Sequence, residues 1–271
     1  MTNLYRLVKA DGLCFEVFGV EVGIRLNEPK MLRKIEERLP PGWRKQPPSR
    51  VDLVYSFFFN HTAGDHRVRR FHVLYGNSQI LARSNNEEEL LEEFERQIGM
   101  HVSITSRSKC FVHAGVVGWK GKAIVMPGRS FSGKTTLVME FLKQGASYYS
   151  DEFAIFDRRG YVYPFPKPLG VRNRESDKQI GLPATALTTK IGIQPLPVGL
   201  VLVTEYKKFT SWRPHSVSAG NAVLKLLANA LSARANPFGN LACLGKAADG
   251  AQVLVGSRGE AHEIVQDVLR D

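Results

Sequence analysis

The sequence predicts an α/β protein of two domains, a smaller α+β domain over residues 1–105 and a larger α/β domain over residues 106–271. A length of 271 residues suits one large or two modest domains. In the first hundred residues, β-type runs alternate with two amphipathic helical stretches. Near residue 105 the pattern changes to short apolar strands separated by a turn, and the second strand leads into a glycine-rich loop.

Strands of the first domain are expected in the runs 14–22, 51–60 and 70–74. A first helix should begin near Pro29, because proline is favoured in the first turn of a helix. A second helix should begin after Asn86, a favoured N-cap residue that Glu89 follows three positions later. Both helices carry apolar residues on one face, so we expect them to cover a sheet.

The second domain should open with two paired strands, 110–118 and 123–126, joined by a turn. A helix follows the loop and ends at Gly145, since glycine is a favoured C-terminal cap. The later elements that we expect are an extended Pro-rich segment (163–170), a strand (199–204), a helix (223–231) and a last helix (261–268).

The composition is that of a soluble globular protein, with 43% hydrophobic residues and a formal net charge of +11. The positive charge is spread along the chain and no nucleic-acid-binding motif accompanies it, so we expect no nucleic-acid partner. Cys14, Cys110 and Cys243 are too few and too scattered for a disulfide framework. No apolar run reaches the roughly 18 residues of a membrane span, and the N-terminus lacks a signal-peptide pattern. We therefore expect a cytoplasmic protein without a membrane partner.

The strongest chemical signal is a phosphate-binding loop. Residues 128–135 read GRSFSGKT and match G-x-x-x-x-G-K-[ST], with a predicted strand before and a helix after. In such a loop, backbone N–H groups and the helix N-terminus bind phosphate oxygens, Lys134 reaches the β and γ phosphates, and Thr135 can ligate Mg²⁺. The predicted nucleotide-binding residues are Gly128, Arg129, Ser130, Phe131, Ser132, Gly133, Lys134, Thr135 and Thr136.

Two adjacent carboxylates, Asp151 and Glu152, follow a short apolar run after the loop's helix. One of them could hold Mg²⁺ while the other accepts the proton of an acceptor hydroxyl. The alternative is a solvated acidic turn at a strand end. His113 lies on the strand paired with the one that feeds the loop, so its imidazole could lie beside the phosphates or satisfy a structural hydrogen bond.

Two other nucleotide-binding classes are excluded. Residues 157–160 read DRRG and fit the D-x-x-G of a GTPase, but they follow the loop too soon for a switch segment, and no N-K-x-D follows. We interpret residues 158–160 as a hairpin turn. The H-R-D and D-F-G signatures of eukaryotic-type protein kinases are missing.

Taken together, these motifs resemble the C-terminal catalytic domain of the HPr kinase/phosphorylase family, particularly its divergent HPr-kinase-related members. The resemblance is specific over residues 111–172 and rests on His113-Ala114, the loop, Gly145, Ser150-Asp151-Glu152 and Pro164-Phe165-Pro166. It implies a P-loop kinase core shared with phosphoenolpyruvate carboxykinases. It also implies transfer of the γ-phosphoryl group of ATP to a serine hydroxyl, with ATP and Mg²⁺ as cofactors.

Carried over to this chain, the resemblance makes Lys134 the γ-phosphate ligand, His113 a catalytic-site residue and Asp151 or Glu152 the base. It makes Thr135 and Asp151 ligands of Mg²⁺, with Glu205 as a second carboxylate ligand. Lys167 and Arg172, near the Pro-rich segment, could neutralise charge on the transferred group. Hexamers in the resembled family imply a homo-oligomer.

This chain departs from HPr kinases proper, which carry His-Gly, a double Asp and a later Arg-Gly-Leu-Gly signature. Here residues 113–114 read HA, residues 151–152 read DE, and no such signature is present. The related members that resemble this chain modify peptides, including lasso-peptide precursors. The sequence therefore predicts a Mg²⁺-ATP-dependent kinase acting on a serine of a peptide or small protein.

Two alternatives stay open at the level of sequence. A kinase of the same fold could phosphorylate a metabolite hydroxyl, in which case its acceptor pocket should be closed. A nucleotide-binding adaptor without transfer activity would bind ATP normally and tolerate removal of Asp151 and Glu152.

Overall fold

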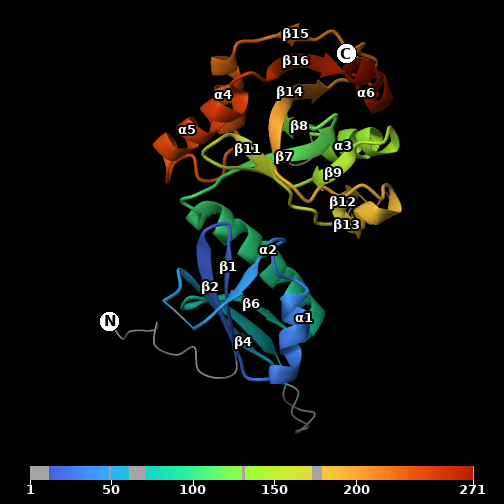
Figure 1. The fold of residues 1–271 in the computed structure, drawn as a ribbon. Coiled ribbons are helices and arrows are strands. Elements are labelled where there is room, and N and C mark those ends of the chain that lie inside the picture. The colour runs from blue at the N-terminus through green and yellow to red at the C-terminus, as the bar shows by residue number, and fades with distance from the viewer. Residues whose placement is uncertain (1–11, 49, 61–70, 130–131, 173–178, 271) are drawn as a thin grey trace. The chain divides into compact units, whose positions relative to one another are not determined.

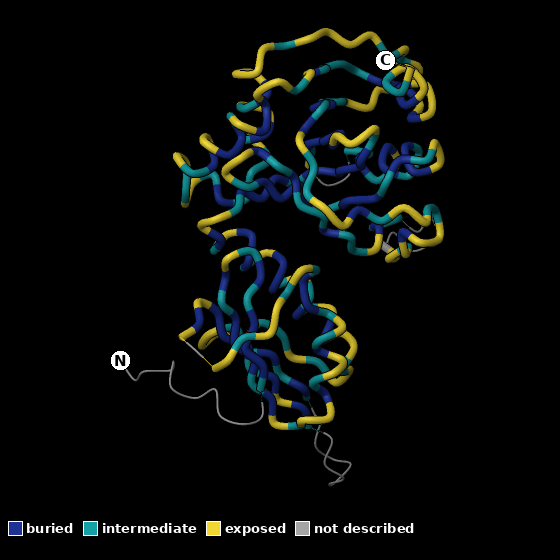
Figure 2. Tube along the Cα trace, viewed as in Figure 1, coloured by how far each residue is buried: buried dark blue, intermediate teal, exposed yellow. Residues whose placement is uncertain are grey.

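A computed structural model of the chain describes residues 12–48, 50–60, 71–129, 132–172 and 179–270 (Figure 1). The chain divides into two compact units, Met1–Arg107 and Ser108–Asp271. The sequence analysis placed the boundary after residue 105. The middle strands of each unit are its most buried part (Figure 2).

The first unit is built on a six-stranded sheet with the order β3-β1-β2-β4-β5-β6. Among the described strands of this sheet, only β2 and β4 run parallel to each other. Its strands are β1 (Gly12–Val17), β2 (Val20–Leu26), β3 (Arg44–Gln46), β4 (Leu53–Phe58), β5 (His72–Gly76) and β6 (Gln79–Ser84). The expected strand over residues 14–22 is thus a hairpin, because the chain reverses at Phe18 and Gly19, both of which adopt positive φ.

The two expected helices of the first unit are present. A 3₁₀ turn (Pro29–Met31) leads into the short helix α1 (Leu32–Glu36), and α2 spans Glu87–Thr105. Asn86 caps α2, since its side chain accepts a hydrogen bond of 2.9 Å from Glu88 N. The apolar face of α2 packs on the sheet, where Phe94 makes edge contacts with Tyr55 and Phe57.

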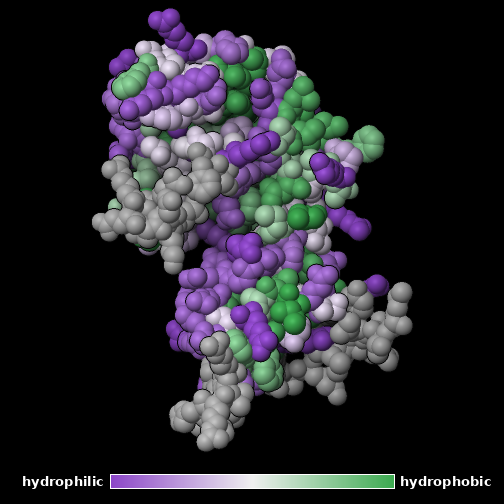
Figure 3. Space-filling model, turned by 180° about the vertical axis from the view of Figure 1, so that it is seen from behind, coloured by the Kyte–Doolittle hydropathy of each residue, from purple (hydrophilic) through white to green (hydrophobic). Residues whose placement is uncertain are grey.

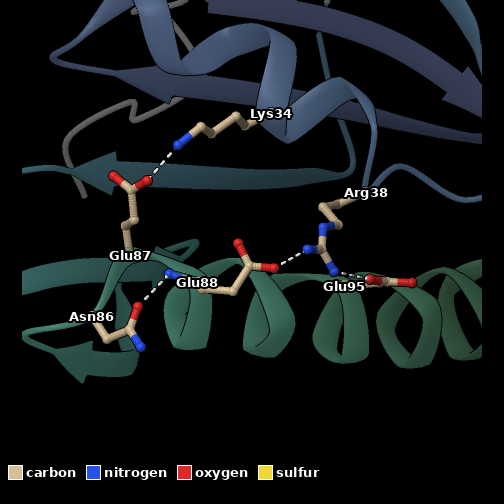
Figure 4. A network of polar contacts seen from close by, with 6 residues as sticks. All are labelled: Lys34, Arg38, Asn86, Glu87, Glu88 and Glu95. Atoms are coloured by element: carbon tan, nitrogen blue, oxygen red, sulfur yellow. Dashed lines mark hydrogen bonds and ion pairs between the residues drawn. The ribbon is translucent and has the colours of Figure 1, made fainter. Parts of the chain in front are cut away.

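Ion pairs join α1 and the residues after it to the first turns of α2 (Figure 4). Lys34 pairs with Glu87, and Arg38 pairs with both Glu88 and Glu95, the latter at 3.2 Å. Glu87 and Glu88 lie in the first turn of α2, where the positive end of the helix dipole favours negative charge. The network therefore ties the short α1 to the long helix.

The second unit is an eight-stranded mixed sheet with the order β11-β10-β7-β8-β14-β16-β15, in which β9 also pairs with β7. The neighbours β8, β14 and β16 are parallel, so their carboxyl ends meet at one edge of the sheet. The strands are β7 (Cys110–Trp119), β8 (Lys122–Pro127), β9 (Ser147–Ser150), β10 (Phe153–Phe156), β11 (Tyr161–Tyr163), β14 (Leu196–Tyr206), β15 (His215–Ser216) and β16 (Gln252–Arg258). A separate hairpin pairs β12 (Leu169–Arg172) with β13 (Gln179–Leu182), and a 3₁₀ turn (Ala184–Ala186) follows.

Helices cover both faces of this sheet (Figure 1). On one face, α3 (Lys134–Lys143) and α6 (Ala261–Arg270) pack on Ile124, Met126 and their neighbours. On the other face, α4 (Ala219–Leu227) and α5 (Pro237–Ala248) pack on Ala123, Val125 and their neighbours. Alternate residues of β8 point to opposite faces, which is why a single apolar strand serves both layers.

The helix expected over residues 223–231 ends earlier, at Leu227. Residues 229–231 leave the helix to pair with β7, where Asn229 O accepts a hydrogen bond from His113 N and Leu231 N donates to Phe111 O.

A few apolar side chains of α4 and α5 stay exposed, and Figure 3 shows apolar groups gathered on that side of the unit. The exposed apolar side chains of α4 and α5 are Leu224, Phe238 and Leu241.

Candidate functional site

The predicted strand, loop and helix occur in that order, and the loop lies where the carboxyl ends of the parallel strands of the second sheet meet. The glycine loop (residues 128–133) leaves the end of β8, and α3 begins at Lys134. Gly128 N donates to His113 O at 3.1 Å, which ties the start of the loop to β7. Gly133 has φ +85°, a conformation that a side chain would strain. Ser130 and Phe131 lie outside the described residues.

Lys134 is buried, with 8% of its surface exposed. Its Nζ donates to the loop carbonyl of Arg129 at 2.7 Å, so the side chain lies back over the loop rather than in solvent. Burial lowers the pKa of Lys134, while the nearby charge of Asp151 acts in the opposite direction. The loop thus holds a cation at the point where the motif places a phosphate.

Asp151 is brought to the first turn of α3. Its Oδ2 accepts hydrogen bonds from Thr135 Oγ1 at 2.9 Å and from Gly170 N at 3.2 Å. Its Oδ1 is buried and has no hydrogen-bond partner among the described residues. Burial raises the pKa of Asp151 to about 6, against the hydrogen bonds from Thr135 and Gly170 and the charge of Lys134, which lower it.

The two carboxylates lie between strands rather than within one. β9 ends at Ser150 and β10 begins at Phe153, so Asp151 and Glu152 form the bend that connects them. Ser150 Oγ shapes this bend, because it accepts hydrogen bonds from the backbone N–H groups of Glu152 and Phe153. The alternation expected of adjacent strand residues therefore does not govern these two side chains.

His113 reaches the same bend from β7. Its Nδ1 lies 2.9 Å from Glu152 O. A carbonyl oxygen only accepts hydrogen bonds, so Nδ1 carries the proton and Nε2 the lone pair when the ring is neutral. Burial, followed by the charge of Lys134, lowers the pKa of His113. The neutral form is thereby favoured near pH 7.

Three further predicted site residues are Glu205, Lys167 and Arg172. Glu205 is exposed at the end of β14 and pairs with Lys207 at 3.0 Å. The Lys167 ammonium lies 5.4 Å from the centroid of the Phe165 ring. Arg172 is the last residue of β12, and its side chain lies outside the described part of the chain. Within the described ranges, no three His, Cys, Asp or Glu side chains gather as a metal-binding group.

Sequence reasoning missed Arg258, the last residue of β16. Its Nη2 donates to Gly133 O at 3.1 Å, across 125 positions of sequence. No local motif marks this arginine, and only the parallel pairing of β16 with β14 brings it to the loop's edge of the sheet.

Among the comparisons with known proteins, only solved structures give matches. No family model matches the chain, and no curated protein matches it. Among solved structures, the chain is similar to the HPr(Ser) kinase/phosphatase from Coxiella burnetii, with a TM-score of 0.33 and 10% identity. The match covers 59% of this chain and 93% of that one. Among the described residues, no helix is both long and apolar enough to cross a membrane.

Proposed function

We propose that the protein is a Mg²⁺-ATP-dependent kinase that transfers the γ-phosphoryl group to a serine hydroxyl of a peptide or small protein. The observation that carries the proposal is the joining of Thr135 to Asp151 beside the buried Lys134. The phosphate-loop motif and the resemblance of residues 111–172 to HPr-kinase-related proteins support it from the sequence.

The chain's own groups suit a nucleoside triphosphate. Backbone N–H groups of the glycine loop and of the first turn of α3 bind phosphate oxygens, aided by the positive end of the helix dipole. Lys134 exchanges the Arg129 carbonyl for a phosphate oxygen, which suits its burial better, because a buried ammonium gains more from an anion than from a neutral carbonyl.

The residues also fit a magnesium ion. A buried carboxylate oxygen without a partner is costly, and Asp151 Oδ1 is such an atom. Asp151 and Thr135 supply the hard oxygen ligands that Mg²⁺ prefers, and the hydrogen bond between them holds both at one place. When bound, the ion neutralises charge on the phosphate oxygens during transfer. Glu205, whose exposed carboxylate pairs with Lys207, stays a predicted second ligand.

The proton of the attacking hydroxyl goes, in this proposal, to His113 Nε2. The Glu152 carbonyl fixes the tautomer that leaves Nε2 with its lone pair, and burial together with Lys134 keeps the ring neutral. Asp151 is less suited to that role, since its Oδ2 accepts two hydrogen bonds and its Oδ1 is assigned to the magnesium ion in this proposal. The homo-oligomer implied by the resemblance stays a prediction.

The test is transfer from γ-labelled ATP with Mg²⁺, using purified protein and a cell lysate separated into macromolecular and small-molecule pools. Lys134→Ala is the inactive control. Label in the macromolecular pool that depends on Lys134 is the expected result, with the acceptor residue then identified as serine by mass spectrometry. Label in the small-molecule pool instead would support the metabolite kinase. Intact ATP binding with no label in either pool would contradict a kinase.

A further inference from the structure

Arg258 is a buried cation held against the glycine loop. Only 2% of its surface is exposed. Its Nη1 donates to Gly259 O at 3.0 Å and its Nη2 to Gly133 O at 3.1 Å. Its guanidinium carbon lies 5.4 Å from the centroid of the Tyr206 ring. Across the described residues, no carboxylate forms an ion pair with it, and its buried Nε has no hydrogen-bond partner.

The contact with Gly133 sets the direction of a functional N–H group. Gly133 C=O and Lys134 N–H belong to one trans peptide unit and point in opposite directions. Arg258 Nη2 and Leu137 N both donate to this carbonyl, so the two together hold the N–H of Lys134 toward the opposite side, away from the body of α3. That N–H is one of the orphan donors with which a helix N-terminus binds an anion.

The fit between Arg258 and Gly133 is close. A Cβ on Gly133 would lie 2.3 Å from Arg258 Nη2, and the φ of +85° is one that glycine alone adopts without strain. The second glycine of the motif therefore makes room for the guanidinium as well as for the turn of the loop.

In the part of the chain that the structure describes, the buried charge of Arg258 has no carboxylate at ion-pair distance. Burial lowers the pKa of Arg258, while the electrostatic influence of Tyr206 and Glu260 opposes the shift. A desolvated guanidinium bound only to neutral carbonyls is costly to the folded protein. An anion bound at the loop would offset that cost, since its charge would lie on the other side of the peptide unit that Arg258 holds.

We propose that Arg258 is a positioning residue of the phosphate site, which orients the Gly133–Lys134 peptide unit toward a bound polyphosphate and adds positive potential behind it. The inference rests on the proposed function, because it requires that the loop bind a polyphosphate. Arg258, at the end of β16, thereby contributes to a phosphate site whose sequence motif covers residues 128–135 alone.

The test measures the binding of ATP and of inorganic tripolyphosphate by titration calorimetry, with thermal unfolding of each unliganded variant alongside. Arg258→Gln removes the charge, Arg258→Lys keeps it with a single ammonium, and Arg270→Gln removes a charge from an exposed arginine as the matched control. Arg258→Gln should weaken tripolyphosphate binding about ten-fold or more, because it removes a buried positive charge from behind the bound anion. Arg258→Lys should bind between Arg258→Gln and the unmodified protein, and Arg270→Gln should bind normally.

The outcomes separate this inference from the proposed function. Unchanged binding in Arg258→Gln, with only a lower melting temperature, would show a purely structural role and overturn the inference while the kinase proposal stands. A failure of the unmodified protein to bind either probe would overturn both. If Arg258→Gln does not fold, Arg258→Lys decides, because binding equal to that of the unmodified protein would contradict a positioning role for the two-armed guanidinium.

Discussion

The hydroxyl of Thr135 donates a 2.9 Å hydrogen bond to Oδ2 of Asp151, and this bond joins the first turn of α3 to the bend between β9 and β10. The two residues are sixteen positions apart in the chain, so tertiary structure brings them together. The bond leaves Asp151 Oδ1 as a buried oxygen without a partner among the described residues, at the place where the proposed magnesium ion would bind.

Thr135→Val should raise the Mg²⁺ concentration needed for half-maximal transfer and lower the maximal rate by about ten-fold or more, because it removes a hydroxyl ligand while keeping the shape of the side chain. Thr135→Ser keeps the hydroxyl and should stay close to the unmodified protein. Initial rates across a Mg²⁺ titration measure both effects. A loss in Thr135→Ser with normal activity in Thr135→Val would mean that the methyl group, not the hydroxyl, matters.

Lys134→Ala should lower transfer by roughly two orders of magnitude or more, because it removes a buried cation from the charge that develops on the phosphoryl oxygens. Lys143→Ala is the matched control, since Lys143 lies on the same helix but is exposed and pairs with Glu140. Steady-state rates with saturating ATP measure the effect. Near-normal turnover in Lys134→Ala would contradict the assignment of the loop to the transferred phosphate.

Asp151→Asn should stabilise the metal-free protein at neutral pH while abolishing transfer. The pKa of Asp151 rises from its ordinary value of 3.8 to about 6 on folding, so the folded chain binds this proton more tightly than the unfolded chain. Stability is therefore lost as pH rises from about 4 to 6, and the full penalty, about 3 kcal/mol at most, remains above pH 6.

Urea unfolding of Asp151→Asn and the unmodified protein, with a chelator present, measures this penalty. The variant should be more stable by about 1–3 kcal/mol at pH 7.5, and the two should converge near pH 4. Added Mg²⁺ should then stabilise the unmodified protein alone. A variant that is less stable at every pH would show that the carboxylate is compensated within the fold.

His113→Asn should lower the rate of transfer about a hundred-fold or more and leave ATP affinity nearly unchanged. An asparagine amide can still donate to Glu152 O from the position of Nδ1, but it has no basic atom at the position of Nε2. Single-turnover rates and ATP binding, measured on the same preparation, separate the two effects. If the rate is unaffected, the proton goes elsewhere, and Glu152→Gln then becomes the informative variant.

Arg38→Met should lower the free energy of unfolding by about 1 kcal/mol, because Arg38 is partly buried and pairs with both Glu88 and Glu95. Lys34→Met, which removes the more exposed pair with Glu87, should cost less. Unfolding at low and high salt measures both, and the difference between the variants should shrink at high salt. Equal costs at both salt concentrations would indicate lost packing rather than lost charge.

Local features of this protein could be predicted from the sequence alone. The cap at Asn86, the turn after Trp119, the hairpin between β10 and β11, and the order of strand, loop and helix around Lys134 all match the structure. Each depends on residues close together in the chain: a cap bonds within the first turn of its own helix, and a tight turn requires residues that accept positive φ. The β-hairpin at Phe18 and Gly19 escaped prediction because Gly19 is a single turn-type residue in an otherwise β-type run, and Phe18 is not a residue that ordinarily adopts positive φ.

The composition of the site was decided only by tertiary structure. Asp151 meets Thr135 because β9 pairs with β7 and ends at Ser150, and Arg258 meets Gly133 because β16 lies beside β14 in parallel register. Strand order and register bring together residues far apart in the chain, and no local pattern of residue types encodes such partners. The motif therefore identified the loop and its lysine. The burial of Asp151 Oδ1 and the hydrogen bond from Arg258 to the loop follow from the packing of the sheet.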